Sequence, residues 1–507
     1  MALFLLVTHG SDGDVLPFVS LGAALVRAGH RAVLLTHAPY REAAARAGLG
    51  FEPIDGEDAF ERVLADTPHL LGGTRARLGW DAFYRRNGMF EQIAAECRTL
   101  RRLHSPGETV LVGRHTSAVS VRFTAELLGA PAAWVALAPT QLMAAPVAAH
   151  LYGTELADGL QAVRAGLGQP PIRDWRAWFA ASDAEIGLWP SWFDAAGTRS
   201  PARTSLTGFP LPDGTADALG ARQAGPTDAP GTLRGGPADG PADVFGGAFA
   251  PGVRPVLATG GTGRMLDPDY YPALVAAAAE TGLPTLLVVR HRDLLPASLP
   301  GNLRWSPGLS FAAAVPRAAA VVHHGGIGTT ARVLASGTPQ VLMADGIDRP
   351  DNAARLARWG LARTVPAARW RTADLPAAVR AAASDHGYRA RARAVAGLPD
   401  PHGAQDAAAD RLVRLLDRTE TAAPDGSVRD RLRDLPPRDL ERIRARLRLR
   451  LDRPATAAPA DLPATATPVT GPAPADRPAT AIPQQATART ARRAGDAPDG
   501  LLLGVER

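Results

Sequence analysis

The sequence has 507 residues and a mass of 53.0 kDa, which is more than one hydrophobic core usually serves, so we expect two compact domains and additional segments. All 56 basic residues are arginine, against 50 acidic residues, and the net charge is only +6. We interpret the arginines as a coding bias, so the composition does not favour a nucleic-acid partner. The single cysteine, Cys97, excludes an internal disulfide framework and a cysteine-rich metal site, and it indicates a reducing compartment.

The chain begins with a short apolar run, residues 2–8, which leads directly into a loop rich in Gly and Asp. This run has no basic leader, so we interpret it as a buried strand and not as a signal peptide. No stretch approaches the ~20 apolar residues that a membrane helix needs. These features predict a cytoplasmic protein and leave peripheral membrane contact open.

Strand-like and helix-like patterns alternate along both halves of the chain. Apolar strand patterns occur at 2–8, 31–36, 109–113, 130–137, 254–263, 284–289, 302–305, 318–324 and 339–344. Apolar residues at helical spacing lie between them, for example at 17–30, 120–129 and 270–282. This alternation predicts an α/β protein with two doubly wound parallel sheets, as in Rossmann-like domains.

The composition divides the chain into two domains, a linker and a tail. We expect one domain at 1–210 and a second at 253–418. Residues 211–252 are rich in Gly, Pro, Ala and Asp without periodicity, which predicts a flexible linker. The tail at 419–507 is poor in apolar residues, apart from a basic amphipathic helix expected at 427–451. That helix suits docking on a protein or on a membrane surface, or has no role.

The most informative segment follows the strand pattern at 318–324. A glycine-rich turn there opens a helix, and its residues are His323, His324, Gly325, Gly326, Gly328, Thr329 and Thr330. Free backbone N–H groups and the positive end of the helix dipole meet at such a turn, which suits a diphosphate. The spacing differs from the dinucleotide pattern G-x-G-x-x-G, so NAD is not favoured.

In these residues the sequence resembles the GT-B glycosyltransferases of family 1, in particular the bacterial branch that glycosylates natural products and sterol-like lipids. The resemblance extends over about residues 1–415, apart from the linker. It implies that the seven residues of the turn hold the diphosphate of a UDP- or dTDP-type sugar donor, with no other cofactor and no metal. It implies further donor contacts at Thr259, Gly261 and Thr262, with Trp305 beside the nucleotide base.

Two positions depart from the family pattern. Asp348 matches the acidic residue that reads the sugar hydroxyls, but Arg349 stands where Gln is usual, and Arg cannot accept a hydrogen bond. Ala331 occupies the place of a ribose-binding glutamate, so ribose recognition is unassigned. We interpret Asp351 and Asn352 as helix structure.

The segment HGSDGDVLP at 9–17 resembles the loop of the family that faces the cleft between the domains. Transfer with inversion needs a base on the attacking hydroxyl group. We favour Asp14 as this base, with His9 as the rival because its ordinary pKa suits the task. The structural alternative for Asp14 is a helix cap.

Aromatic residues fall where the family builds its acceptor pocket, and the candidate pocket residues are Trp80, Phe83, Tyr84, Phe90 and His115. Aromatic residues at helical spacing also serve as core. The implied function is an inverting, metal-independent hexosyltransferase acting on a hydroxyl of an apolar natural product or lipid. The alternative is a catalytically degenerate scaffold or helper protein of a biosynthetic assembly, and a sugar epimerase of the same fold is a weaker option.

Overall fold

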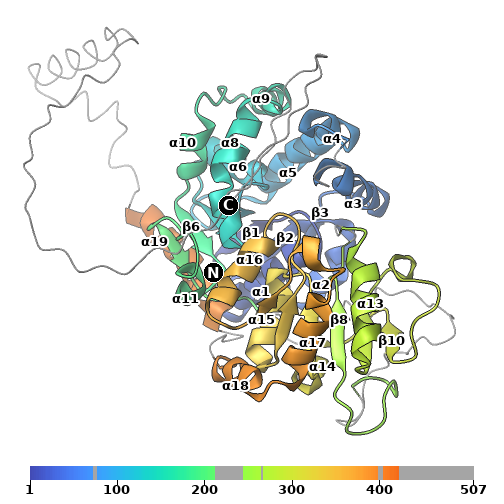
Figure 1. Ribbon diagram of the computed structural model, residues 1–507. Coiled ribbons are helices and arrows are strands. Elements are labelled where there is room, and N and C mark those ends of the chain that lie inside the picture. Colours follow the sequence, from blue (N-terminus) through green and yellow to red (C-terminus); the bar gives the residue numbers. More distant parts are fainter. Residues whose placement is uncertain (72–76, 212–243, 264–266, 398–402, 422–507) are drawn as a thin grey trace, which may run out of the picture. The chain divides into compact units, whose positions relative to one another are not determined.

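Two parallel β-sheets organise the computed structural model, which describes residues 1–71, 77–211, 244–263, 267–397 and 403–421 (Figure 1). Most of the predicted linker lies outside the described residues. The predicted tail helix at 427–451 lies outside them as well.

The first sheet has seven strands in the order β3-β2-β1-β4-β5-β6-β7, and every neighbouring pair is parallel. Its strands are β1 (Leu3–Val7), β2 (Arg31–Thr36), β3 (Gly50–Pro53), β4 (Thr109–Arg114), β5 (Ala132–Ala136), β6 (Ala184–Gly187) and β7 (Thr204–Leu206). The helices of this half are α1 (Asp12–Arg27), η1 (Ala38–Tyr40), α2 (Arg41–Arg46), α3 (Glu57–Leu71), α4 (Trp80–Arg86), α5 (Met89–Leu103), α6 (Val119–Leu128), α7 (Pro139–Met143), α8 (Ala145–Gly153), α9 (Ala157–Gly166), α10 (Trp175–Ala180) and α11 (Ser191–Asp194).

The second sheet has six strands in the order β10-β9-β8-β11-β12-β13, again parallel throughout. Its strands are β8 (Val256–Thr259), β9 (Thr285–Val288), β10 (Leu303–Ser306), β11 (Ala320–His323), β12 (Gln340–Leu342) and β13 (Arg363–Thr364). The helices that follow β8 are α13 (Tyr270–Thr281), η3 (Arg292–Leu294), α14 (Phe311–Ala314), η4 (Val315–Arg317), α15 (Ile327–Ser336), α16 (Arg349–Arg358), η5 (Ala367–Arg369), α17 (Asp374–Ser384), α18 (His386–Ala394) and α19 (Gly403–Thr421).

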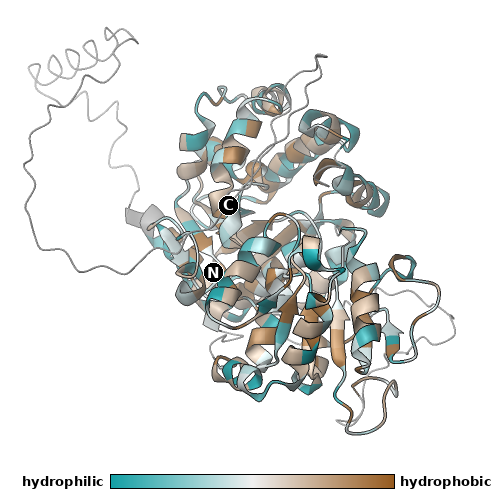
Figure 2. Ribbon diagram, viewed as in Figure 1, coloured by the Kyte–Doolittle hydropathy of each residue, from teal (hydrophilic) through white to brown (hydrophobic). Residues whose placement is uncertain are grey.

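The strands are apolar because helices cover both faces of each sheet. All five residues of β1 are buried, and so are the four residues of β8. In Figure 2 the hydrophobic colour is strong in β8, whereas α16 carries hydrophilic residues on its outer side. The predicted fold class, two parallel doubly wound sheets, is confirmed. Among the helices of the described residues, none is long and apolar enough to span a bilayer.

The last described helix departs from the predicted division of the chain. We expected residues 253–418 to form one domain, but α19 packs against α1 of the first half. Ala408, Ala409 and Leu412 are buried in the core of the first sheet. The chain therefore returns to the first half after completing the second, because the apolar stripe of α19 finds its partner there.

The described end of the predicted linker, residues 244–252, also differs from the flexible connection that we expected. Phe245 is 9% exposed and packs with Phe249 against the second sheet, so these two side chains anchor this end of the predicted linker to a core.

Candidate functional site

His9 lies in the loop after β1, and it pairs with a carboxylate of α5. Its Nε2 atom is 2.8 Å from Oε1 of Glu96. The side chain of His9 is 12% exposed and that of Glu96 only 1%, so the pair reaches the surface through the imidazole. If Nε2 donates its proton to the carboxylate, the lone pair of Nδ1 can accept another.

Glu96 is held by three donors. Gln92 donates to Oε1 at 2.9 Å, and the hydroxyl of Ser120 donates to Oε2 at 2.5 Å. Burial acts to raise the pKa of Glu96, but the charge of His9 and the hydrogen bonds from His9, Ser120 and Gln92 outweigh it, so the pKa is lowered. Glu96 is therefore a charged carboxylate that orients the imidazole of His9.

A second histidine fixes the backbone beside His9. The N–H of Gly10 donates to Nε2 of His37 at 2.9 Å, and Nδ1 of His37 is 2.6 Å from Oδ2 of Asp55. Burial lowers the pKa of His37, although Asp55 opposes the effect, so the ring is neutral and Nε2 can accept. Gly10 has a φ of +116°, and a Cβ there would lie 2.3 Å from the Asp14 carboxylate. Only glycine fits this turn.

Asp14 has the contacts of a helix-capping residue. Its carboxylate accepts the N–H of Ser11 at 3.0 Å, within a capping box at the start of α1. It also forms an ion pair with Arg114 at the end of β4. We expected Asp14 to be the base; these contacts support the capping alternative, and the assignment of the base to Asp14 or to His9 stays a prediction.

The two predicted donor loops of the second half meet at His324. A Cβ added to Gly261 would lie 2.7 Å from the His324 ring, and one added to Gly326 would lie 2.4 Å from it. Burial, Arg349 and His323 lower the pKa of His324, so the ring is neutral. Within the described residues its buried Nδ1 makes no hydrogen bond, which leaves one polar atom for a ligand between the loops.

His323 has a structural role, unlike the phosphate contact that we expected. Its Nε2 is 3.0 Å from Oε1 of Gln340, and its Nδ1 accepts the N–H of Gly325 at 3.2 Å. Burial lowers its pKa to about 4, so it is neutral and shapes the turn before α15. Gly325 takes a φ of +89° in this turn.

The start of α15 carries the remaining residues of the turn. Gly328 is exposed and Thr329 is half-buried, whereas Thr330 is fully buried. The first N–H groups of a helix have no intrahelical partner, so they are available beside Gly326 and Gly328. The buried hydroxyl of Thr330 makes no hydrogen bond within the described residues, so its contact with the diphosphate stays a prediction.

The loop after β8 is fixed by its own hydrogen bonds. Thr259 is 3% exposed, and its hydroxyl accepts the N–H of Gly261 at 3.0 Å. Thr262 is half-buried. Thr259 therefore shapes the loop, whose open side is presented by Gly261 and Thr262.

Asp348 and Arg349 stand at the start of α16. Burial raises the pKa of Asp348, with the charge of Asp14 adding to the effect and Arg349 opposing it. The influence of Asp14 places the loop of the first half within electrostatic range of Asp348. Asn352 links the two motifs of the second half, because its amide donates to Asp348 at 3.3 Å and to the carbonyl of Gly325 at 3.1 Å.

Trp305 belongs to the core of the second half. It is 6% exposed, its indole N–H donates to the carbonyl of Val289 at 2.9 Å, and Arg292 lies over its ring. These contacts do not favour stacking on a nucleotide base, which we expected.

The predicted acceptor residues are mostly core as well. Phe83, Tyr84 and Phe90 are each less than 9% exposed and pack together, and Trp80 packs against the same cluster. His115 is 2% exposed, and burial lowers its pKa to about 4. These contacts support the core alternative for Phe83, Tyr84, Phe90 and His115, whereas Trp80 is only half-buried, and the acceptor pocket stays a prediction.

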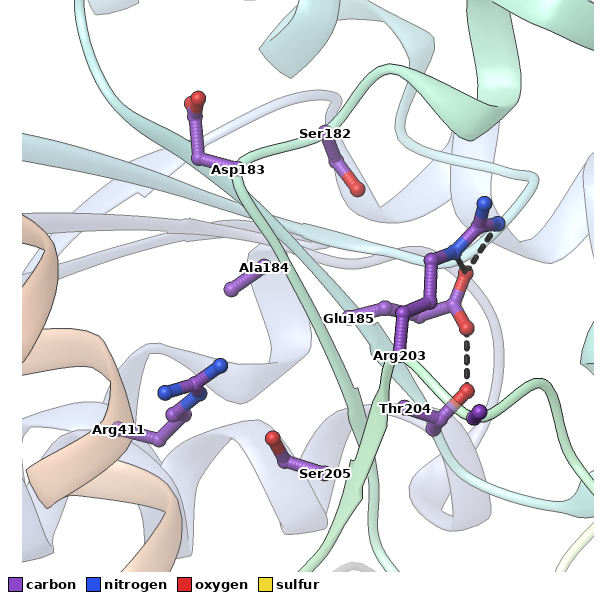
Figure 3. Close-up of a pocket in the computed structure, with 9 residues that line it drawn as sticks. Ser182, Asp183, Ala184, Glu185, Arg203, Thr204, Ser205 and Arg411 are labelled. Carbon is purple, nitrogen blue, oxygen red and sulfur yellow. Dashed lines mark hydrogen bonds and ion pairs between the residues drawn. The ribbon is translucent and has the colours of Figure 1, made fainter.

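A separate hollow of about 380 Å³ lies at the amino-terminal ends of β6 and β7 (Figure 3). Glu185 accepts hydrogen bonds there from Arg203 and Thr204. His9 follows the carboxyl end of its strand, so this hollow is not part of the site described above.

Sequence reasoning missed Glu96, His37, Asp55 and Arg114. Glu96 and Gln92 lie on the buried face of α5, among Phe90, Ile93, Cys97 and Leu100. Polar residues on an otherwise apolar helix face were the sequence signal that could have identified Glu96 and Gln92. His37 follows β2 and Arg114 ends β4, and both strands pair with β1. Their place at the same end of the sheet as His9 was the second signal.

Comparison with known proteins identifies both halves of the chain. Residues 4–97 match the family "Glycosyltransferase family 28 N-terminal domain", and residues 275–407 match "Erythromycin biosynthesis protein CIII-like, C-terminal domain". The O-mycaminosyltylonolide 6-deoxyallosyltransferase of Streptomyces fradiae is 41% identical over 146 residues, which are 28% of this chain and 34% of that protein. The chain spans little more than a third of the length of the first curated relatives that it matches, at 34% and 39%.

Solved structures share the fold over nearly the whole described chain. The calicheamicin glycosyltransferase CalG4 has a TM-score of 0.58 and 18% identity, covering 84% of this chain and 100% of that one. The glycosyltransferase VinC in complex with dTDP has a TM-score of 0.56 and 19% identity, covering 82% and 100%. The resemblance that we noted in the motifs is confirmed: residues 4–97 match a family 28 glycosyltransferase N-terminal domain, residues 275–407 match an EryCIII-like C-terminal domain, and the solved glycosyltransferases share the GT-B fold of the chain.

Proposed function

We propose that the protein is an inverting, metal-independent glycosyltransferase that transfers a hexose or deoxyhexose from a nucleotide diphosphate to a hydroxyl of an apolar natural product. The observation that carries the proposal is the His9–Glu96 pair, 2.8 Å apart, at the carboxyl end of β1. A buried carboxylate that orients a partly exposed imidazole is an arrangement for removing a proton. This pair also favours an enzyme over a degenerate scaffold.

The reaction has one bond-forming and one bond-breaking event at the anomeric carbon of the sugar. The acceptor oxygen attacks this carbon while its proton passes to Nδ1 of His9. The bond from the anomeric carbon to the diphosphate oxygen breaks on the opposite face, and the electron pair leaves with the diphosphate. Glu96 stabilises the imidazolium that forms, because it is charged and hydrogen-bonded to Nε2.

The leaving diphosphate is assigned to the start of α15. Free N–H groups beside Gly326 and Gly328 and the helix dipole favour negative charge at this point. The unpaired Nδ1 of His324 adds a donor when it carries the proton of the neutral ring. These groups stabilise the departing charge without a metal ion.

The donor is proposed to be a thymidine diphosphate sugar. One relative is a TDP-daunosamine transferase from Streptomyces peucetius, 38% identical over 95 residues, and VinC has been solved with dTDP. Asp348 and Arg349 are proposed to read the sugar, since both stand at the mouth of α16 beside Gly325.

The test is a transfer assay with the purified full chain. dTDP-glucose, a dTDP-deoxysugar and UDP-glucose are each offered with a macrolide, an anthracycline aglycone and a sterol. We expect one glycoside whose anomeric configuration is opposite to that of the donor, unchanged product formation in EDTA, and a loss of about 100-fold in kcat for His9→Ala. Arg371→Ala, in an exposed pair with Asp269, is the control. Binding of dTDP without any transfer or donor hydrolysis would identify a helper protein instead.

A further inference from the structure

We infer that Arg290 and Asp12 form a positioning pair that couples closure of the two halves to the placement of His9. The inference rests on the proposed function, because His9 is the group to be placed. Arg290 follows β9 in the second sheet, and Asp12 is the first residue of α1 in the first half.

The pair spans the two halves directly. Nη2 of Arg290 is 2.7 Å from Oδ2 of Asp12, and the side chains are 19% and 14% exposed. Both residues come shortly after the carboxyl ends of parallel strands, β9 and β1, where sheets of this kind bind their ligands. The contact therefore lies at the edge of the site and not in the core.

Asp12 keeps its direction without Arg290. The hydroxyl of Tyr40 donates to its other oxygen, Oδ1, at 2.8 Å, and Tyr40 is only 4% exposed. The start of α1 favours a negative charge at this position through the helix dipole. The carboxylate is thus oriented to receive Arg290, and this contact fixes the loop at a further point.

The same loop carries His9 three residues earlier. Three contacts within the first half hold this loop. Glu96 binds His9, His37 accepts the N–H of Gly10, and Arg114 forms an ion pair with Asp14. Arg290 adds an ion pair with Asp12 from the second half, which carries the proposed donor loops. Closing the second half onto the first therefore completes the support of His9.

A second junction between the halves has the opposite character. Arg355 of α16 is 1% exposed and donates to the carbonyls of Phe193 and Asp194, beside an apolar cluster drawn from both halves. That junction is buried. A single, partly exposed ion pair contributes little stability, so the Arg290–Asp12 contact is the one suited to open in each catalytic cycle.

The kinetic test uses substitutions that separate the ion pair from the rest of the loop. Arg290→Ala and Asp12→Asn are expected to lower kcat by about 10- to 100-fold with a smaller change in the acceptor KM. Tyr40→Phe keeps the ion pair and is expected to lower kcat less. The exchange Arg290→Asp with Asp12→Arg is expected to recover part of the loss, and Arg371→Ala is the matched control. Unchanged kcat in Arg290→Ala, or no recovery in the exchange, would overturn the inference.

A structural test works without any transfer activity. Spin labels at Ala45→Cys and Ser298→Cys, both exposed positions, report the distance between the halves, because Cys97 is buried and stays unlabelled. We expect dTDP to narrow the distance distribution of the labelled protein but not of its Arg290→Ala variant. Identical responses to dTDP would overturn the inference. Failure of sugar transfer together with the expected narrowing would contradict the proposed function and leave the pair intact.

Discussion

His9 and Glu96 are 87 positions apart in the sequence, yet their side chains share a 2.8 Å hydrogen bond beside the carboxyl end of β1. The packing of α5 explains the contact: β1 pairs with β4, so Val7 lies beside Gly113, and the apolar face of α5 shares a core cluster with Val7. His9 provides the imidazole, and Glu96 provides the negative charge that orients it.

Glu96→Gln is expected to lower kcat about 100-fold with little loss of folded protein, because the amide keeps the shape but not the charge opposite the imidazolium. The lowered pKa of Glu96 adds a pH signature. Its stabilising contribution is present above the unfolded pKa and is lost as the pH falls through the folded value, so the variant should lose less stability on acidification. Kinetics at pH 7 and urea unfolding at pH 7 and 4 measure both effects. Glu91→Gln, exposed on the same helix, serves as the control, and equal kcat values in both variants would remove Glu96 from the mechanism.

Asp14→Asn is expected to reduce stability by about 1 kcal/mol and to keep kcat within about fivefold of the unsubstituted protein. The carboxylate caps α1 and pairs with Arg114, so its removal weakens the helix start more than the chemistry. Steady-state kinetics and urea unfolding of the variant test both parts. Abolished turnover with normal dTDP binding would instead restore Asp14 as the base that its motif suggests.

Much of the fold follows from the sequence because buried parallel strands are continuous apolar runs. The run at 2–8 and the run at 109–113 correspond to β1 and β4 within two residues at each end. Four strands, β3, β6, β7 and β13, escaped notice because each has only two to four residues, and the two of β13 are exposed. The destination of α19 could not be read from its pattern, since an amphipathic stripe does not say which surface it covers.

The site was only partly predictable, for a related reason. The glycine-rich turn after β11 was readable because the conformation of Gly325 and the close approach at Gly326 leave no choice of residue. The roles of its two histidines were not readable. Gln340, which binds Nε2 of His323, lies on another strand, so the sequence does not show this hydrogen bond. Only the structure shows that His323 has hydrogen-bond partners within the protein while Nδ1 of His324 has none in the described residues.

His323 is expected to contribute to the loss of stability in acid. Its folded pKa is about 4, below the ordinary value of 6.5, so between these pH values the unfolded chain binds a proton that the folded protein does not. Stability is full above pH 6.5 and falls by about 1.4 kcal/mol per pH unit below it. In His323→Gln this slope should shrink by that amount, measured by urea unfolding at pH 4.5, 5.5 and 6.5. His150→Gln, at an exposed position, should keep the full slope, and parallel slopes for both variants would contradict the assignment.

Arg355 joins the two halves, and its replacement is expected to separate their unfolding. Its guanidinium pairs with Asp351 at 2.7 Å and donates to the carbonyls of Asp194 at 2.8 Å and Thr198 at 2.9 Å. Gly197 is needed for this approach, because a Cβ there would lie 2.7 Å from the guanidinium carbon. Arg355→Met fills a similar volume but leaves the carbonyls unpaired, which costs about 3 kcal/mol. Lysine cannot reach all of the carbonyls from one point, so Arg355→Lys should recover only part of this loss.

Calorimetry and urea unfolding followed by two probes measure the effect on the junction. We expect one transition in the unsubstituted protein and two in Arg355→Met, since each half keeps its own sheet while the link between them is weakened. Arg380→Ala breaks an exposed pair with Glu280, whose side chains are 47% and 56% exposed, and should change stability by less than about 0.5 kcal/mol. A single, unshifted transition in Arg355→Met would mean that the apolar cluster around Phe193 and Leu356 holds the halves together without the arginine.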